Sequence, residues 1–355
     1  MPPALLDLTL DVVPRARFDM LNLRERMSGE DREALAPYSR ALFWSSHTTA
    51  GFLDRSVAAR LNSKPGVVDY VATFRAIFPE GAPYEHDQLD RRTELDPEQR
   101  LIEPRNADSH LAFIAAGMRT CVRYRNRPPE PVCFVDLDGV CAGRPRRRRT
   151  RIVGYHSEEE VTQVTVEVPV SQHPVDSINL KDSRLGLYEQ IADLAFHYGV
   201  EKGRVRLALD DSERHAGVTV NEYETLLMRH DLAEVLRDPL RFAIEKGRHV
   251  WADPRAVPAK TLEYAKYDLV QIMNLLVDGL GLRESIVERL INRAVAAPAD
   301  RFLRMKRSVD LLVSDDHQTG RARVVEGTYQ SPILVQWHRA QRQARLLSIT
   351  LTAFS

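Results

Sequence analysis

The segment PVCFVDLDGVCAG, residues 131–143, decides between two folds for this chain. An apolar strand that runs into D-x-D-G is the way in which aspartyl-phosphate phosphatases present a nucleophile, here Asp136, and an acid two residues later, here Asp138. Such enzymes place a helix after this strand of a parallel sheet. Here an arginine-rich stretch and the strand-like segment 151–156 follow instead, which is typical of a hairpin with Asp138-Gly139 in the turn. The sequence therefore favours an antiparallel hairpin and keeps a phosphatase with Asp136 as the lesser alternative.

The composition describes a soluble globular protein. The 355 residues favour two domains, and 43% hydrophobic with 28% charged residues exclude a disordered chain. Fifty basic and fifty acidic side chains cancel, so no overall field attracts nucleic acid or a membrane surface. An odd number of cysteines without a C-x-x-C pair indicates a reducing compartment. Acidic residues interrupt the apolar start and no run reaches about 20 apolar residues, so a cytoplasmic location without membrane contact is predicted.

Hydrophobic periodicity predicts a mixture of strands and helices. Period-two alternation predicts strands over 5–13, 40–50 and 160–170, among others. Helical spacing predicts helices over 17–28, 66–78, 108–118, 183–200 and in a long region, 222–310. Because helices and strands do not alternate regularly, we expect an α+β fold with a largely antiparallel sheet.

The order of these elements repeats along the chain. Segment 44–52, WSSHTTAGF, corresponds to 211–219, DSERHAGVT, and NADSHLAF at 106–113 corresponds to PADRFLRM at 298–305. A period near 180 residues indicates two domains of similar fold. We therefore predict domains at 1–158 and 159–355, with a helical insertion in the second.

Three histidines of the first half are candidate metal ligands. His47 lies in SSHTTA, His86 in YEHD and His110 in NADSHL. Imidazole is a common ligand of zinc and similar ions, and three of them leave coordination positions open for water or substrate. Their spacing fits no local metal signature, so on spacing alone three surface or satisfied polar histidines are the favoured interpretation.

The three histidine motifs, in this order, resemble the YjbQ family, also known as UPF0047, whose name-giving activity is secondary thiamine-phosphate synthase. TVNE at 219–222 and GTYQ at 327–330 resemble further motifs of that family, T-I-N-E and G-T-W-Q. The resemblance covers nearly the whole chain as tandem copies. It implies a divalent metal, zinc or another imidazole-favouring transition metal, held by His47, His86 and His110. It also implies a homo-oligomer.

The two copies depart from the family pattern in complementary ways. The first has LDRS at 53–56 in place of T-I-N-E and lacks G-T-W-Q. The second copy keeps versions of both motifs. It has Glu213 and Phe302 at two of the histidine positions, while His249 corresponds to the third. The second copy is therefore interpreted as degenerate. It either completes a composite pocket or is retained for packing.

The predicted function is that of a metal-dependent enzyme acting on a small anionic or phosphorylated molecule. Asp87 is a candidate general base or partner of a ligating imidazole, and Glu222 is a second candidate catalytic residue. Diphosphate transfer usually employs magnesium with oxygen ligands, so the activity named for the family and a different reaction both stay open. Five further residues are predicted to bind substrate: Thr48, Thr49, Asn221, Tyr329 and Gln330.

Two other interpretations stay beside this one. The chain could be a non-catalytic binding or scaffold protein in which the second copy organises assembly. The arginine run 144–149, with Arg151, is typical of a solvated edge strand, and without interleaved aromatic residues it does not indicate nucleic-acid binding.

Overall fold

The structure, a computed structural model, describes residues 5–61, 64–92, 95–127, 130–173, 175–223, 231, 306–315 and 320–355. The chain divides into two compact units. Unit 1 comprises Met1–Arg55, Met118–Glu222 and Lys306–Ser355, and unit 2 comprises Ser56–Gly117 and Tyr223–Met305. The boundary predicted after residue 158 falls within unit 1. Most of the predicted helical region 222–310, with His249 and Phe302, lies outside the described residues.

The first sheet of unit 1 is antiparallel and has the strand order β1-β9-β3-β5. Its strands are β1 (Leu6–Val12), β9 (Arg148–Tyr155), β3 (Arg40–Ser45) and β5 (Cys121–Arg125). Leu8 pairs with Ile152, and Ile152 pairs with Phe43 on its other side. Every residue of β3 after Arg40 is buried, because this central strand is covered on both faces.

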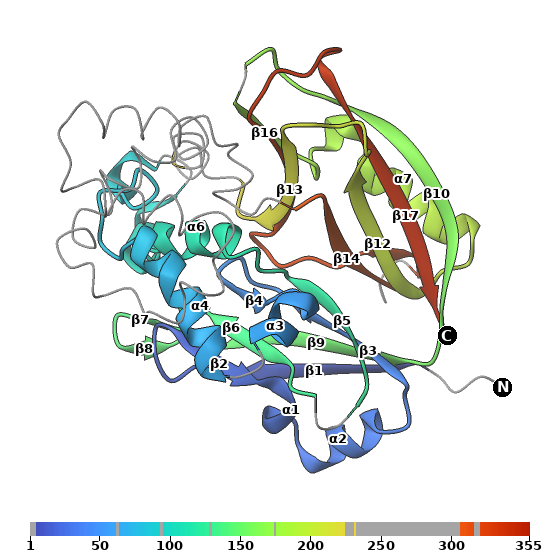
Figure 1. Ribbon diagram of the computed structural model, residues 1–355, viewed down its shortest axis with the longest axis horizontal. Helices are drawn as coiled ribbons and strands as arrows, with labels where there is room; N and C mark the ends of the chain where they lie inside the picture. The colour runs from blue at the N-terminus through green and yellow to red at the C-terminus, as the bar shows by residue number, and fades with distance from the viewer. Residues whose placement is uncertain are drawn as a thin grey trace. The chain divides into compact units, whose positions relative to one another are not determined.

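The second sheet of unit 1 has the strand order β10-β17-β12-β14-β15. Its strands are β10 (Glu158–Pro169), β17 (Ala344–Phe354), β12 (Lys202–Leu209), β14 (Ser308–Asp315) and β15 (Ala322–Val324). The long pair β10 and β17 lies side by side in Figure 1. Burial alternates along β17, as its alternating apolar and polar residues predict.

Smaller antiparallel sheets complete unit 1. The order β2-β6-β4 joins Asp19–Asn22, Cys133–Asp136 and Ala50–Phe52, and β11-β16-β13 joins Asp176–Asn179, Ser331–Gln336 and Ala216–Asn221. A two-residue pair, β7 (Val140–Cys141) and β8 (Arg144–Pro145), forms a hairpin whose turn is Ala142-Gly143, both with positive φ. Asp138-Gly139 lies instead in the segment between β6 and β7, and β6 pairs with β2 and β4, so the predicted position of the turn is wrong.

The strand order of the first half recurs in the second half. β1-β9-β3-β5 corresponds to β10-β17-β12-β14, and β2-β6-β4 corresponds to β11-β16-β13, with antiparallel pairing throughout. The elements also occur in the same order along the chain. The fold class is α+β with mostly antiparallel sheets, as predicted. The tandem duplication itself stays a prediction.

Unit 1 has a continuous apolar interior. One cluster centres on Phe43, Phe52 and Phe134, whose rings meet at tilted or edge-to-face angles. A second cluster fills the space between the sheets of the other half and helix α7 (Leu187–His197). A third joins the two large sheets, and in it Tyr155 stacks on Phe354 with ring centroids 4.1 Å apart. The burial of these apolar side chains is the main stabilising contribution to the free energy of folding of unit 1.

Short helices cover the rest of the described chain. In unit 1 they are α1 (Leu23–Arg26), α2 (Gly29–Leu35) and the 3-10 turn η2 (Ser183–Leu185). In unit 2 they are α4 (Lys64–Ile77), η1 (Leu89–Arg91), α5 (Pro97–Ile102) and α6 (Ala107–Ala115), and α3 (Arg55–Leu61) begins at the unit boundary. Asp96 and Gln99 form a capping box at the start of α5, as their spacing favours. All nine residues of α6 are buried.

One predicted element is only half correct. Helical spacing predicted a helix over 17–28, but residues Asp19–Asn22 form strand β2 and only Leu23–Arg26 are helical. Met20 and Leu21 pair with Val135 and Phe134, so long-range strand pairing overrides the local pattern. Within the described residues, no helix is both long and apolar enough to cross a membrane.

Candidate metal centre

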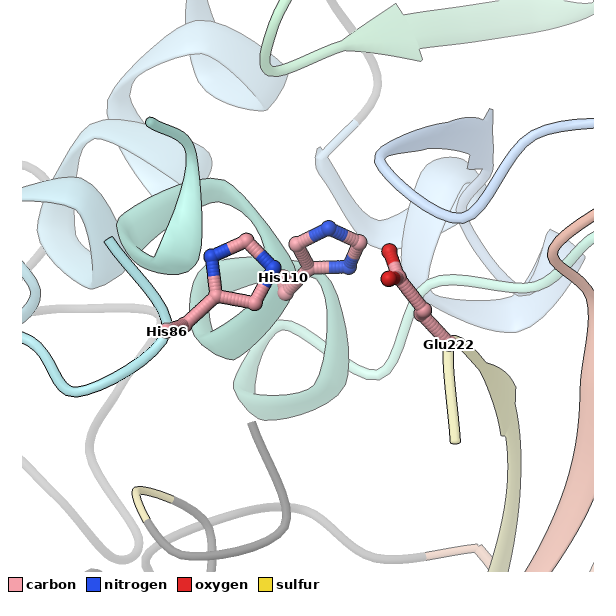
Figure 2. A group of neighbouring side chains, drawn as sticks. All are labelled: His86, His110 and Glu222. Atoms are coloured by element: carbon pink, nitrogen blue, oxygen red, sulfur yellow. The ribbon is translucent and has the colours of Figure 1, made fainter. Parts of the chain in front are cut away.

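Two buried histidines lie together in unit 2. His86 follows α4 in the loop before η1, and His110 lies on α6. Their side chains are 0% and 1% exposed, and the ring centroids are 5.2 Å apart with the planes inclined at 52° (Figure 2). One ring nitrogen of each lies within 4.8 Å of the other, a separation at which both could bind one ion.

The backbone of His86 is fixed by a carboxylate from a distant part of the chain. Asp231, which is fully buried, accepts hydrogen bonds from the Glu85 amide at 3.2 Å and the His86 amide at 2.9 Å. These bonds satisfy two N–H groups that a buried loop would otherwise leave unpaired. His86 is therefore held on a defined loop conformation.

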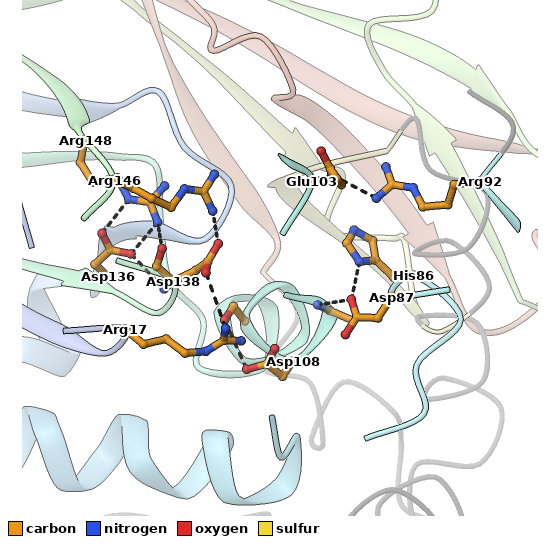
Figure 3. A network of polar contacts seen from close by, with 12 residues as sticks. Arg17, His86, Asp87, Arg92, Glu103, Asp108, Asp136, Asp138, Arg146 and Arg148 are labelled. Atoms are coloured by element: carbon orange, nitrogen blue, oxygen red, sulfur yellow. Dashed lines mark hydrogen bonds and ion pairs between the residues drawn. The ribbon is translucent and has the colours of Figure 1, made fainter. Parts of the chain in front are cut away.

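The ring of His86 is oriented by its neighbour Asp87. Oδ1 of Asp87 lies 2.9 Å from Nδ1 of His86 and also accepts the amide of Ala107, the first residue of α6, at 3.1 Å (Figure 3). A carboxylate at Nδ1 keeps the proton there and leaves the lone pair of Nε2 available. Nε2 of His86 is buried, and no group of the described residues forms a hydrogen bond with it. A bound cation would provide the partner that this atom lacks.

Negative charge surrounds the two imidazoles. Burial raises the pKa of the Tyr84 hydroxyl, and the carboxylates of Asp108, Asp231 and Asp87 raise it further. Three carboxylates close to two imidazoles favour a cation. Arg92, which is 2% exposed, pairs with Glu103 at 3.1 Å, so its positive charge is compensated locally.

His47 lies in unit 1, in the loop 46–49 between β3 and β4. Its Nε2 accepts the Arg149 amide at 2.9 Å and lies 3.2 Å from the Ser46 hydroxyl. Burial, followed by the charges of Arg148, Arg146 and Arg149, lowers the pKa of His47 to about 3. The ring is therefore neutral, and it uses one nitrogen to anchor the loop to β9. Its predicted role as a ligand stays a prediction.

Glu213 holds the corresponding place in the second half. Its Oε1 accepts the Leu346 amide at 2.8 Å, and its Oε2 pairs with Arg345 at 2.8 Å. His47 accepts a strand amide of β9 in the same manner as Glu213 accepts one of β17. The two contacts are of the same kind, and the replacement of a histidine by Glu213 stays a prediction.

Two predicted substrate-binding residues bind the loop 46–49 instead of facing solvent. Nε2 of Gln330 donates to the Ser45 and His47 carbonyls, both at 2.8 Å, and Nδ2 of Asn221 donates to the Thr48 carbonyl at 3.3 Å. Gln330 and Asn221 are 3% and 0% exposed. The motifs kept by the second half therefore stabilise the histidine loop of the first half.

The other predicted substrate-binding residues differ in exposure. Thr49 is buried and its carbonyl accepts the Leu137 amide at 3.0 Å, and Thr48 is half-buried. Tyr329 is 58% exposed. Their contacts with a substrate stay predictions.

Glu222 is the last residue of unit 1 and directly follows β13. It is 9% exposed, and its backbone amide donates to Oδ1 of Asn221 at 2.8 Å. Its predicted catalytic role stays a prediction.

The D-x-D-G carboxylates are structural. Asp136 and Asp138 are fully buried, and Asp136 accepts Nε and Nη2 of Arg148 at 2.6 and 2.8 Å, while Asp138 binds Arg146 (Figure 3). Strand β6 is antiparallel to both of its neighbours. A phosphatase nucleophile needs an accessible carboxylate at the end of a parallel strand, so the phosphatase alternative loses its structural basis.

Sequence reasoning did not single out Asp231 or Asp108. Asp108 lies inside the NADSHL motif, and its place two residues before His110 was a usable signal. Asp231 lies about 145 residues from His86 and carried no local signal.

Comparison with known proteins gives matches only among solved structures. No family model and no curated protein matches the chain. A YbjQ-like protein of unknown function from Sulfolobus solfataricus P2 is 15% identical. The match covers 56% of this chain and 99% of that protein, and its TM-score is 0.28. A hypothetical protein from Aeropyrum pernix K1 is 14% identical over 54% of this chain and 98% of its own, with a TM-score of 0.28. An uncharacterised YjbQ/UPF0047 family protein from Clostridium acetobutylicum is 12% identical. The match covers 53% of this chain and 98% of that protein, with a TM-score of 0.26. Each of these three matches covers about half of this chain.

Proposed function

We propose that His86 and His110 bind a divalent transition metal and that this metal serves an enzymatic site for a small anionic molecule. The observation that supports this most directly is the buried Nε2 of His86, which has no partner among the described residues while Asp87 holds Nδ1. A carboxylate behind a histidine is the usual arrangement at a metal ligand. Zinc is the first metal to test, because imidazole ligands suit it.

The remaining ligands are proposed from sequence and ligand chemistry. His47 is the candidate from the histidine motifs, but its Nε2 already accepts the Arg149 amide. Glu222 offers a buried carboxylate from the TVNE motif.

Metal analysis of the purified protein tests the site. We expect about one tightly bound ion per chain, lost in His86→Ala and in His110→Ala. His173→Ala is the matched control, because its side chain is exposed. Retention of metal in both variants would overturn the proposal. Metal content of Glu222→Gln and His47→Ala then identifies the third ligand.

The reaction is proposed from the chemistry of such a centre. A metal held by the two imidazoles would polarise an oxygen of a substrate or lower the pKa of bound water. Asp87 then orients His86, and phosphorylated metabolites are the substrates to screen, including the two precursors of thiamine phosphate. A metal-loaded protein without turnover of any of them would support the alternative, a non-catalytic binding protein.

We also propose that the chain is a tandem duplication, with domains at 1–158 and 159–355. The repeated strand order and the equivalent roles of His47 and Glu213 support this proposal. The second copy then supplies Gln330 and Asn221 to the histidine loop of the first. A cytoplasmic location and a homo-oligomer complete the proposal, and light scattering measures the latter.

A further inference from the structure

Unit 1 contains a cavity that the proposed metal centre does not use. Its volume is about 420 Å³, within the range of about 300 to 1,000 Å³ of small-molecule sites. Strands β3, β5, β12 and β14 line it, together with the last residue of β9, the first residue of β10 and the segment after β4. All of its lining residues belong to unit 1.

Arginine dominates the lining of this cavity. Six arginines contribute to it: Arg40, Arg55, Arg119, Arg123, Arg125 and Arg206. Arg123 and Arg125 are two residues apart on β5 and therefore project from the same face of that strand. Arg40 on β3 lies directly opposite Arg125 in the strand register. Two like charges at directly opposed positions destabilise a sheet unless something else compensates them.

The carboxylates of the lining compensate only part of this charge. They are Asp54, Glu158 and Asp310, so six positive charges face three negative ones and the excess is three. Glu158 is shared, because Arg123 donates to both of its oxygens at 2.7 Å and Arg40 donates at 2.9 Å. Asp310 pairs at 3.1 Å with Arg204 and Arg55 pairs at 3.1 Å with Glu130. Both partners lie outside the lining, so the two pairs offset each other and the excess stays at three.

Two guanidinium groups keep donors for a ligand. Within the described part of the chain, the Arg125 side chain forms no hydrogen bond or ion pair, and Arg206 donates only to the Ser308 hydroxyl, at 2.9 Å. Both residues are exposed. A guanidinium presents a fork of N–H donors that matches a phosphate in geometry as well as in charge.

We propose that this cavity binds a small molecule through a phosphate or diphosphate group, with Arg125 and Arg206 as its principal ligands. Two or three negative charges on one group would compensate the excess charge of the lining. The opposed arginines Arg40 and Arg125 would then share an anion instead of repelling each other. This binding does not depend on the proposed metal or on its ligands.

Calorimetric titration with inorganic pyrophosphate, in chelator-treated protein, tests the proposal. We expect saturable binding that weakens with added salt. The double variant Arg125→Ala/Arg206→Ala should raise the dissociation constant at least about tenfold, because each substitution removes charged hydrogen bonds. The control Arg147→Ala should change it less than about twofold, since its side chain is 73% exposed and pairs with Asp11 outside the cavity.

Further variants separate this proposal from folding and from the metal centre. His86→Ala should bind pyrophosphate as the wild type does, so loss of the metal and loss of this site are distinguishable. If the double variant does not fold, by circular dichroism, the single variant Arg125→Gln on edge strand β5 replaces it. A nucleoside diphosphate titrated in parallel shows whether an organic group adds affinity. Absence of saturable binding to the wild type, or equal binding by the arginine variants, would overturn the proposal.

Discussion

The Asp87 carboxylate lies 2.9 Å from Nδ1 of His86 and joins that ring to the first turn of α6 through the Ala107 amide. The two residues are adjacent in sequence, yet the contact with α6 spans 20 residues of chain. This relationship fixes both the tautomer and the direction of the His86 ring before any metal binds.

Replacing Asp87 by Asn should therefore weaken metal binding without abolishing it. The side-chain oxygen of the asparagine can accept a hydrogen bond from Nδ1 of His86, but it carries no charge. Loss of a carboxylate partner behind a ligating histidine typically lowers metal affinity about 10–100-fold. Competition with a chromogenic chelator measures the change. Asp90→Asn, an exposed position in η1, is the control and should leave affinity unaltered. An unchanged affinity in Asp87→Asn would show that the carboxylate has no influence on the site.

Gln330→Ala should destabilise unit 1. The substitution leaves the Ser45 and His47 carbonyls without their donor and the Gly327 amide without its acceptor. Buried groups left unpaired cost about 1–3 kcal/mol each, so the free energy of unfolding should fall by at least about 1 kcal/mol. Urea denaturation checks this. Gln163→Ala, on an exposed face of β10, should change stability by less than about 0.5 kcal/mol.

His47 should make the chain sensitive to mild acid. Its pKa is lowered to about 3 in the folded state, against about 6.5 when unfolded, so the unfolded chain binds the proton first. Its contribution to stability is full above about pH 6.5 and is lost progressively as the pH falls towards 3. Between about pH 7.5 and pH 5, the free energy of unfolding should fall by up to about 2 kcal/mol because of His47.

The variant His47→Gln isolates this effect. The glutamine oxygen can accept the Arg149 amide but does not titrate, so the acid-dependent loss should be smaller in the variant. Urea unfolding of metal-free protein at both pH values measures the difference. His173→Gln should follow the wild type. Parallel curves for wild type and His47→Gln would rule out this assignment.

Asp136→Asn should unfold the chain more easily and leave the metal content unchanged. Removing one charge of the buried pair with Arg148 leaves the guanidinium uncompensated, at a cost of about 3–5 kcal/mol. Asp11→Asn, whose partner Arg149 is 3.6 Å away at the surface, should cost less than about 1 kcal/mol. A stable Asp136→Asn protein that has lost phosphate-ester hydrolysis would restore the phosphatase alternative.

The strands were predictable where one strand face is polar. Alternation predicted 160–170, and the structure forms β10 over Glu158–Pro169. The helix predicted at 66–78 is α4, whereas the hairpin turn expected at Asp138-Gly139 lies four residues later, at Ala142-Gly143. Residues 19–22 were not predicted as a strand, because their structure depends on pairing with β6, more than 110 residues away.

The candidate site was predictable only in part, for a related reason. Short motifs identified His86, Asp87 and His110 as chemically informative residues. Their assembly depends on Asp231 and on the loop conformation, which no periodicity encodes. Gln330 and Asn221 were predicted to contact substrate, but their side chains bind carbonyls of the loop 46–49. Sequence motifs indicated that these residues matter, and only the fold shows what they touch.

Gly327 approaches the Ser46 carbonyl so closely that a β carbon there would collide with it. This glycine and Gln330 belong to the last tenth of the polypeptide, whereas the loop they secure belongs to the first fifth. During synthesis on the ribosome, the SSHTTA segment must therefore wait for almost the entire chain to emerge before it gains the last of its partners. Nascent chains stalled short of residue 327 would hold that segment only through its contacts with residues such as Leu137 and Arg149.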